Sequence, residues 1–177
     1  GMKWKLRLQR DEDRAPAFNP PIIKDGTIYF GSVDGNFYAL DIRSGYMRWV
    51  FRTEGAINSI PFADERHVYF GSNDGKVYAV SLEKGEQAWA FQTESTVQST
   101  VVHHEDSVIF SSDGGSTYFL SPDGVEEHRL ANPVWHRDSF QVHDDVVYFA
   151  PGPPSRQHSL GAYDLEDALV QYLGARW

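Results

Sequence analysis

The sequence predicts an all-β protein, a β-propeller with four blades in the chain, each blade a four-stranded antiparallel sheet. The main observation is a repeat of 40 residues, in which 30–39 recurs as 70–79 and, with more changes, as 110–119. Between 30–54 and 70–94, twelve of twenty-five positions are identical. Four short strands in about 40 residues is the repeat length of a propeller blade.

Each repeat unit carries the signals of four strands. In the first unit, 27–30 is rich in β-forming residues. The Asp-Gly pair at 34–35 predicts a hairpin turn, because glycine adopts a positive φ at little steric cost. Residues 36–40 pair back across this turn, a second turn ends at Gly45, and a further strand carries Trp49. The same signals follow 40 residues later, so similar sheets are expected to pack face to face.

The repeats define one propeller domain over residues 3–177. Its last part, 165–177, fits a strand or a short helix, because leucines recur at helical spacing while the repeat pattern is retained. The retained pattern favours a strand. The blades are expected at approximately 17–54, 55–94, 95–131 and 132–177.

The segment before the first blade, residues 3–8, alternates polar and apolar side chains. Its Trp4 aligns with Trp49 and Trp89 of the repeat units. The segment therefore predicts an extra outer strand that closes the ring by completing a blade from the other end of the chain. Such a closure removes an open sheet edge.

The second turn of each unit and the tryptophan after it resemble the docking motif of pyrroloquinoline quinone (PQQ)-type propellers. That motif reads Ala-x-Asp-x-x-Thr/Ser-Gly-x-x-x-Trp, and residues 39–49 match it. A tryptophan can lie flat on a neighbouring blade only where small residues leave room for its large ring. The resemblance implies structural docking roles for Trp4, Ala39, Asp41, Gly45, Trp49, Ala79, Gly85, Trp89, Ala162 and Tyr172.

The PQQ-type family includes quinoprotein dehydrogenases, sensor domains and the non-catalytic lipoprotein propellers of outer-membrane-protein assembly. Its dehydrogenases use a vicinal cysteine pair, an aspartate base and a calcium or similar ion, whereas this chain has no cysteine. We therefore expect no enzyme activity, no catalytic residue and no PQQ. The alternative is a degenerate quinoprotein that binds PQQ or another planar cofactor, with weak or no oxidoreductase activity.

The charge balance restricts the class of partner. Sixteen basic and 25 acidic side chains give a formal net charge of −9. This disfavours nucleic acid and anionic membranes, which attract clustered lysine and arginine. The chain has no apolar run approaching the ~18 residues of a membrane span. A protein or small-molecule ligand remains as the expected partner of a scaffold or sensor.

The segments that enter the innermost strands are the best binding candidates, because they line the central funnel of a propeller. Asn58, Gln98 and Asp138 hold the same relative position in three units and predict a polar ring. Convergent polar groups in a concavity are typical of a binding site. A water-filled channel without a specific ligand is the competing interpretation. Beside the third of these positions lie Trp135, His136 and Arg137.

The adjacent His103 and His104 suggest a metal site at first sight. They align, however, with segments 23–26 and 63–66, which are predicted as turns between strands. Adjacent residues on a strand also point to opposite faces, which is poor geometry for chelation. We therefore expect a solvated turn and no metal site.

The number of blades leaves three assemblies open. PQQ-type propellers mostly have about twice as many blades as this chain. Four units can close as a small monomeric ring, pair with a second chain into an eight-bladed ring, or be an excerpt of a longer protein. The compartment is also open: cytoplasmic if Met2 is the native start, and otherwise periplasmic or extracellular.

Overall fold

The computed structural model describes residues 4, 19–104, 106–131, 140–143, 146–149, 160–164 and 170–173. All regular elements in these ranges are strands, and they form four separate four-stranded antiparallel sheets. The predicted all-β fold with four-stranded blades is thereby confirmed. Within the same ranges, no helix is long and apolar enough to cross a membrane.

Sheets 1 and 2 are the two most similar blades. Sheet 1 consists of β1 (Ile22–Lys24), β2 (Thr27–Gly31), β3 (Asn36–Asp41) and β4 (Met47–Arg52). Sheet 2 consists of β5 (Phe62–Ala63), β6 (His67–Gly71), β7 (Lys76–Ser81) and β8 (Gln87–Gln92). In both, the strands lie in chain order across the sheet.

Sheets 3 and 4 repeat this order. Sheet 3 consists of β9 (Val102–His104), β10 (Ser107–Ser111), β11 (Ser116–Leu120) and β12 (Glu126–Ala131). Sheet 4 consists of β13 (Phe140–His143), β14 (Val146–Phe149), β15 (Leu160–Asp164) and β16 (Val170–Leu173). The favoured strand at the end of the chain is thus present as β16, while 165–169 and 174–177 lie outside the described residues.

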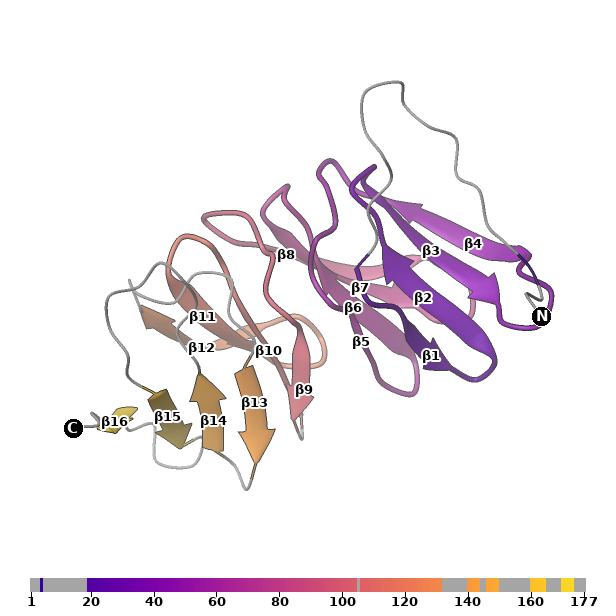
Figure 1. Ribbon diagram of the computed structural model, residues 1–177. Helices are drawn as coiled ribbons and strands as arrows, with labels where there is room; N and C mark the ends of the chain where they lie inside the picture. Colours follow the sequence, from indigo (N-terminus) through magenta and orange to yellow (C-terminus); the bar gives the residue numbers. More distant parts are fainter. Residues whose placement is uncertain are drawn as a thin grey trace.

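The four sheets follow one another along an arc, with sheet 1 and sheet 4 at its two ends (Figure 1). The core lies between consecutive sheets rather than inside one of them. Between sheets 1 and 2, the rings of Phe37 and Phe70 stack with centroids 4.0 Å apart and planes 5° apart. Tyr69 and Val77 of sheet 2 pack in one cluster with Val97, Phe110 and other residues of the third repeat. Each blade therefore depends on its neighbours for burial of its faces.

The outer strand pairing contains a bulge in three of the sheets. The register shifts between Ala39 and Leu40 in sheet 1, and at the equivalent positions of sheets 2 and 3. Because of this shift, Ala39 lies opposite Trp49 in sheet 1, and Ala79 lies opposite Trp89 in sheet 2. The described pairing of β15 with β16 runs without such a shift.

Candidate functional site

The indole of Trp49 lies on the next sheet. Its Nε1 donates a hydrogen bond of 3.0 Å to the carbonyl oxygen of Leu82. A Cβ atom built on Gly85 would come within 2.7 Å of the Trp49 ring, and the backbone of Gly85 has φ +71°. Both the space and the dihedral angle therefore require glycine there.

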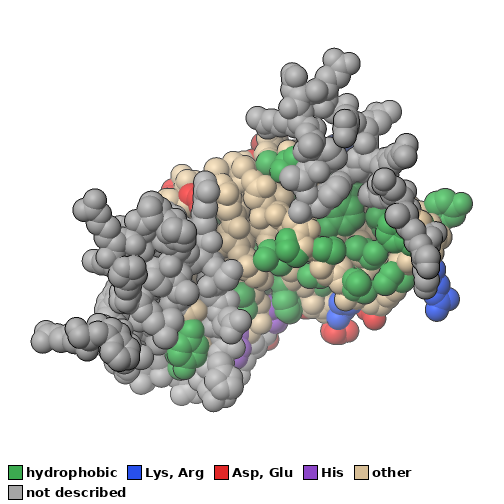
Figure 2. Space-filling model, viewed as in Figure 1, with side chains coloured by type: hydrophobic (Ala, Val, Ile, Leu, Met, Phe, Trp, Pro, Cys, Tyr) green, Lys and Arg blue, Asp and Glu red, His purple; other side chains and the backbone are tan. Residues whose placement is uncertain are grey.

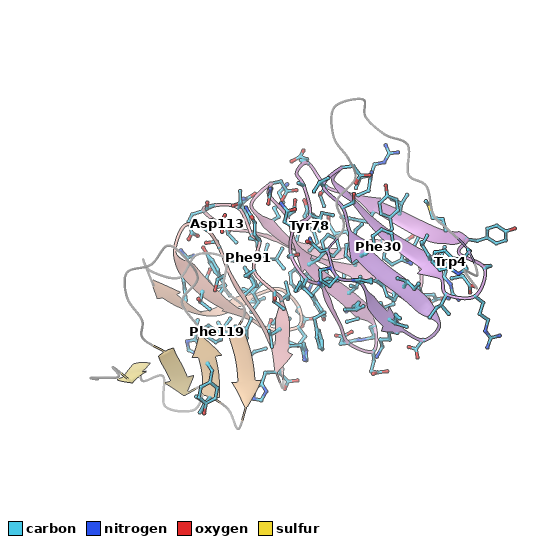
Figure 3. The ribbon with its side chains drawn as sticks, viewed as in Figure 1. Trp4, Phe30, Tyr78, Phe91, Asp113 and Phe119 are labelled. Atoms are coloured by element: carbon cyan, nitrogen blue, oxygen red, sulfur yellow. The ribbon has the colours of Figure 1, made fainter. Side chains whose placement is uncertain are left out.

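The same contact occurs at two other places in the chain. Trp89 donates to the carbonyl oxygen of Pro122 at 2.8 Å, and its ring covers Gly124. Trp4 donates to the carbonyl oxygen of Ile42 at 2.9 Å, and its ring covers Gly45 (Figure 3). Each of these three tryptophans thus contacts a glycine of the repeat that follows it.

Asp41 organises the turn that leads to Trp49. Its carboxylate accepts hydrogen bonds from Arg48 Nη2 at 2.8 Å, from Ser44 Oγ at 2.8 Å and from two backbone N–H groups. The Arg48 guanidinium and the Ser44 donors hold the pKa of Asp41 well below its usual range. Asp41 therefore shapes the turn that precedes Trp49.

Sheet 4 differs from the expectation for Tyr172. The register places Gln171 opposite Ala162, and Tyr172 opposite Gly161. Gln171 therefore holds the register position of Trp49, although the resemblance to the docking motif implies Tyr172 there. The difference arises because the bulge that inserts one residue before Trp49 is not present between β15 and β16.

A second group of functional candidates lies at one end of the strands, where turns join them. This surface is here called the turn edge. It combines the β2–β3, β6–β7 and β10–β11 turns with the segments that leave β4 and β8. Backbone hydrogen bonds join these parts across sheets, such as Asn73 N to Ala56 O and Asp113 N to Thr96 O, both 2.8 Å. Its carboxylates are Asp34, Glu54, Asp74, Glu94 and Asp113.

Most carboxylates of the turn edge are held by specific donors. Asp74 accepts hydrogen bonds from Tyr78 Oη at 2.7 Å and from the backbone N–H of Glu54 in the preceding repeat at 3.1 Å. Asp113 accepts one from Thr96 Oγ1 at 2.6 Å and one from Gln98 Nε2 at 3.1 Å. These bonds fix the carboxylates in place between two sheets.

The ionisation of the turn edge follows from these contacts. Partial burial raises the pKa of Asp34, but hydrogen bonds from Tyr38 and Asn36 outweigh it, so that the pKa lies below the ordinary value. The pKa of Glu94 is likewise lowered, because hydrogen bonds outweigh the effect of burial. Burial and the bond to Asp34 raise the pKa of Tyr38 to about 12. The edge therefore carries negative charge at neutral pH.

The predicted polar ring is described only in part. Asn58 and Gln98 are both half-buried and lie in equivalent segments before β5 and β9. Gln98 is bound to Asp113, so that its amide belongs to the turn edge. Asp138, Trp135, His136 and Arg137 lie outside the described residues.

Asn19 lies in the first of the segments expected to enter an innermost strand, and its Nδ2 donates to the carbonyl oxygens of Ile57 and Ser59, at 2.9 and 3.3 Å. Sequence reasoning missed one polar contributor, Asp113. Asp113 stands where the other repeats have Val33 and Asn73, and so interrupts the repeat pattern at one position. This departure from the repeat is the signal that could have identified it.

The expectation of a solvated turn at the histidine pair was wrong. His103 and His104 belong to β9, and the ring of His103 stacks on Phe62 with centroids 5.4 Å apart and planes 6° apart. Strand β9 ends at His104 and has the same length as β1, the equivalent strand of sheet 1. His103 therefore takes part in packing between sheets 2 and 3.

Comparison with known proteins agrees with this architecture. A family model described as outer membrane protein assembly factor BamB matches residues 3–152. The search of curated proteins gave no match. The family match confirms the resemblance to PQQ-type propellers.

Solved structures show the same fold. The chain is similar to BamB from Moraxella catarrhalis, with a TM-score of 0.68 and 17% identity over 82% of this chain and 48% of that one. It is similar to the computationally designed Ika8, with a TM-score of 0.76 and 14% identity over 90% of this chain and 49% of that one. For the designed Ika4, the TM-score is 0.73 and the identity 13%, over 87% of this chain and 94% of that one. The chain therefore spans about half the length of BamB and Ika8.

Proposed function

The chain belongs to the BamB family of outer membrane protein assembly factors, and we propose that it is a non-catalytic propeller scaffold that binds a protein partner. The observation that carries this proposal is the family match over residues 3–152. A scaffold of this kind acts by recognition on a rigid surface. The lack of cysteine supports the absence of quinoprotein catalysis, because the dehydrogenases that the sequence resembles use a cysteine pair.

The turn edge is the surface that we propose for the partner. Loops and turns on a repetitive scaffold carry specificity more often than its strands do. Asp34, Glu54 and Glu94 are exposed on this edge, and Asp74 and Asp113 are partly exposed. Together with the formal net charge of −9, these carboxylates favour a partner that presents basic side chains.

The turn edge is also ordered before any partner binds. Asp74 and Asp113 are fixed by donors from the preceding repeat, and Thr53 and Thr93 tie the following segments to Gly35 and Gly75 by hydrogen bonds of 2.9 Å. A surface that is already in place loses less conformational entropy when it binds. This supports recognition by shape and charge without a large rearrangement.

Affinity capture from an extract of the source cells tests this proposal. Glu54→Gln with Glu94→Gln removes two exposed charges from the turn edge. Glu83→Gln with Glu86→Gln removes two exposed charges from the opposite edge of sheet 2 and serves as the control. We expect the wild type and the control to retain the same protein, and the turn-edge variant to lose it. Equal retention by all three would rule out the turn edge as the binding surface.

The quinoprotein alternative is tested separately with PQQ and calcium added to the purified chain. A bound cofactor stabilises the folded state and changes its own absorption spectrum. We expect neither a spectral change nor a rise in Tm. A saturable rise in Tm that requires PQQ would support the degenerate quinoprotein instead.

A further inference from the structure

The two ends of the arc are incomplete in different ways. Sheets 2 and 3 each lie between two other sheets, whereas sheet 1 and sheet 4 lie at opposite ends (Figure 1). In this repeat, one face of each sheet packs against the preceding sheet and the other against the following one, as the clusters between sheets 1, 2 and 3 show. Sheet 1 therefore has a face for a preceding sheet, and sheet 4 has a face for a following one.

Trp4 already occupies part of the preceding sheet's place. It contacts Gly45 and Ile42 as Trp49 contacts Gly85 and Leu82. Trp49 belongs to the outermost strand of its sheet, so that Trp4 stands for the outermost strand of a sheet before sheet 1. In sheet 4, the register position of that tryptophan is held by Gln171. Trp4 thus lies on sheet 1 as Trp49 lies on sheet 2, whereas sheet 4 has Gln171 at the equivalent register position.

The inner half of the sheet 1 face is left partly uncovered. Ile28 is half-buried, whereas Val68 and Val108, which have the same register position in sheets 2 and 3, are fully buried. Ile23, which pairs with Ile28 across β1 and β2, has 62% of its surface exposed. Figure 2 shows hydrophobic side chains gathered over this end of the molecule. Trp4 covers the outer part of the face, and the inner part has the character of an unfilled sheet contact.

The far end of the chain offers the complementary face. Tyr148 pairs with Ala162, as Tyr29 pairs with Ala39 in sheet 1. Tyr29 is buried against the next sheet, in the same cluster as Val68. Tyr148, by contrast, is only half-buried. Tyr148 is equivalent to Tyr29, and Ile28 is equivalent to Val68. Tyr148 is therefore expected to pack on a sheet face like the one around Ile28.

We infer that the face of sheet 1 around Ile23 and Ile28 binds the fourth sheet of a second copy of this chain, with Trp4 lying beside the outer edge of that sheet. Two such contacts, related by a twofold axis, close a ring of eight sheets. Each contact joins sheet 1 of one copy to sheet 4 of the other, so it is heterologous. A heterologous contact forms a closed ring only when the repeated rotation brings the last copy back onto the first, as a twofold rotation does with two copies.

Two observations favour a second copy over closure within one chain. Sheets 1 and 4 lie at opposite ends of the arc (Figure 1). The four sheets also superpose on 48% of BamB and 49% of Ika8, with TM-scores of 0.68 and 0.76. The arc therefore has the curvature of half of a chain about twice as long, and a second copy of equal length supplies the other half.

Light scattering of the purified chain, coupled to size exclusion, tests this assembly. We expect a mass about twice the 20.1 kDa of one chain. Ile23→Glu places a charge in the contact and is expected to give a monomer, because a charge buried at an apolar interface is costly. Val125→Glu is the control, since Val125 is 63% exposed in the turn between β11 and β12 and lies outside the contact. It is expected to leave the mass doubled, and a wild-type chain of single mass would overturn the inference.

A cysteine pair distinguishes a second copy from internal closure. The chain has no cysteine of its own, so that Ile23→Cys with Tyr148→Cys introduces the only two thiols. The equivalent residues of sheets 2 and 3, Tyr69 and His103, have ring centroids 6.2 Å apart. A short bis-maleimide is expected to join two chains covalently. A cross-link confined to single chains, or none, would overturn the inference.

Discussion

One tyrosine of the repeat lacks the partner that its counterparts have. Tyr38 and Tyr78 donate to Asp34 and Asp74 at 2.7 Å. In the third repeat Gly114 replaces the aspartate, and the hydroxyl of Tyr118 is buried without a hydrogen-bond partner in the part of the chain that the structure describes. An unsatisfied buried hydroxyl costs free energy that a phenyl ring does not.

The two tyrosines therefore respond differently to the same substitution. Tyr78→Phe is expected to lower the free energy of unfolding by about 2 kcal/mol, because a hydrogen bond to a carboxylate is lost. Tyr118→Phe is expected to leave it unchanged or to raise it by about 1 kcal/mol. Urea unfolding with a constant m-value measures both. A loss at Tyr118 as large as that at Tyr78 would show that its hydroxyl has a partner.

Asp64 makes stability depend on pH on the acidic side. Burial raises its pKa, but hydrogen bonds from the backbone N–H of His67 and from Tyr69 Oη outweigh this, so that the folded pKa lies below 3.8. The contribution of a lowered pKa is fully present above the unfolded value and is lost as pH falls through the folded value. Asp64→Asn should therefore be less stable than the wild type at pH 7, and the difference should shrink below about pH 4. Urea unfolding at several pH values checks this, and a constant difference would contradict it.

At the level of the elements, the tryptophan contact depends on space as well as on dihedral angle. Gly85 and Gly26 have nearly the same φ, +71° and +72°, but only Gly85 faces an indole ring at 2.7 Å. The nearest atom to a Cβ at Gly26 is 4.0 Å away. Substitutions at these two glycines therefore distinguish the cost of backbone strain from the cost of the steric clash with the indole ring.

Alanine at these two positions gives the corresponding prediction. Gly26→Ala is expected to lower the free energy of unfolding by about 1 kcal/mol, from φ strain alone. Gly85→Ala is expected to cost about 1–3 kcal/mol more, because Trp49 must move. Thermal and urea unfolding of both variants measure the difference. Equal losses would mean that Trp49 adjusts without cost.

The sequence predicts those elements whose residues recur with the period. The hairpins and the strand order within a blade follow from the 40-residue spacing, whereas the pairs of glycine and tryptophan are implied by the resemblance to the docking motif. The position of Tyr172 does not, because one bulge residue shifts the register and a bulge leaves no mark in residue spacing. The contacts of Asp113 and Asn19 depend on loops that approach from another repeat, and periodicity within one repeat carries no information about them.

For the whole molecule, a ring closed by two copies couples folding to assembly. The end faces of sheets 1 and 4 are then buried only in the dimer, so that dissociation exposes Ile23, Ile28 and Tyr148. Mass action makes the Tm of such a protein rise with chain concentration, whereas the Tm of a self-closed monomer is independent of it. We therefore expect Tm to increase over a hundredfold range of concentration in differential scanning calorimetry. Ile23→Glu should abolish this dependence of Tm on concentration, and Val125→Glu should preserve it. A wild-type Tm that does not change with concentration would contradict assembly of the ring from two copies.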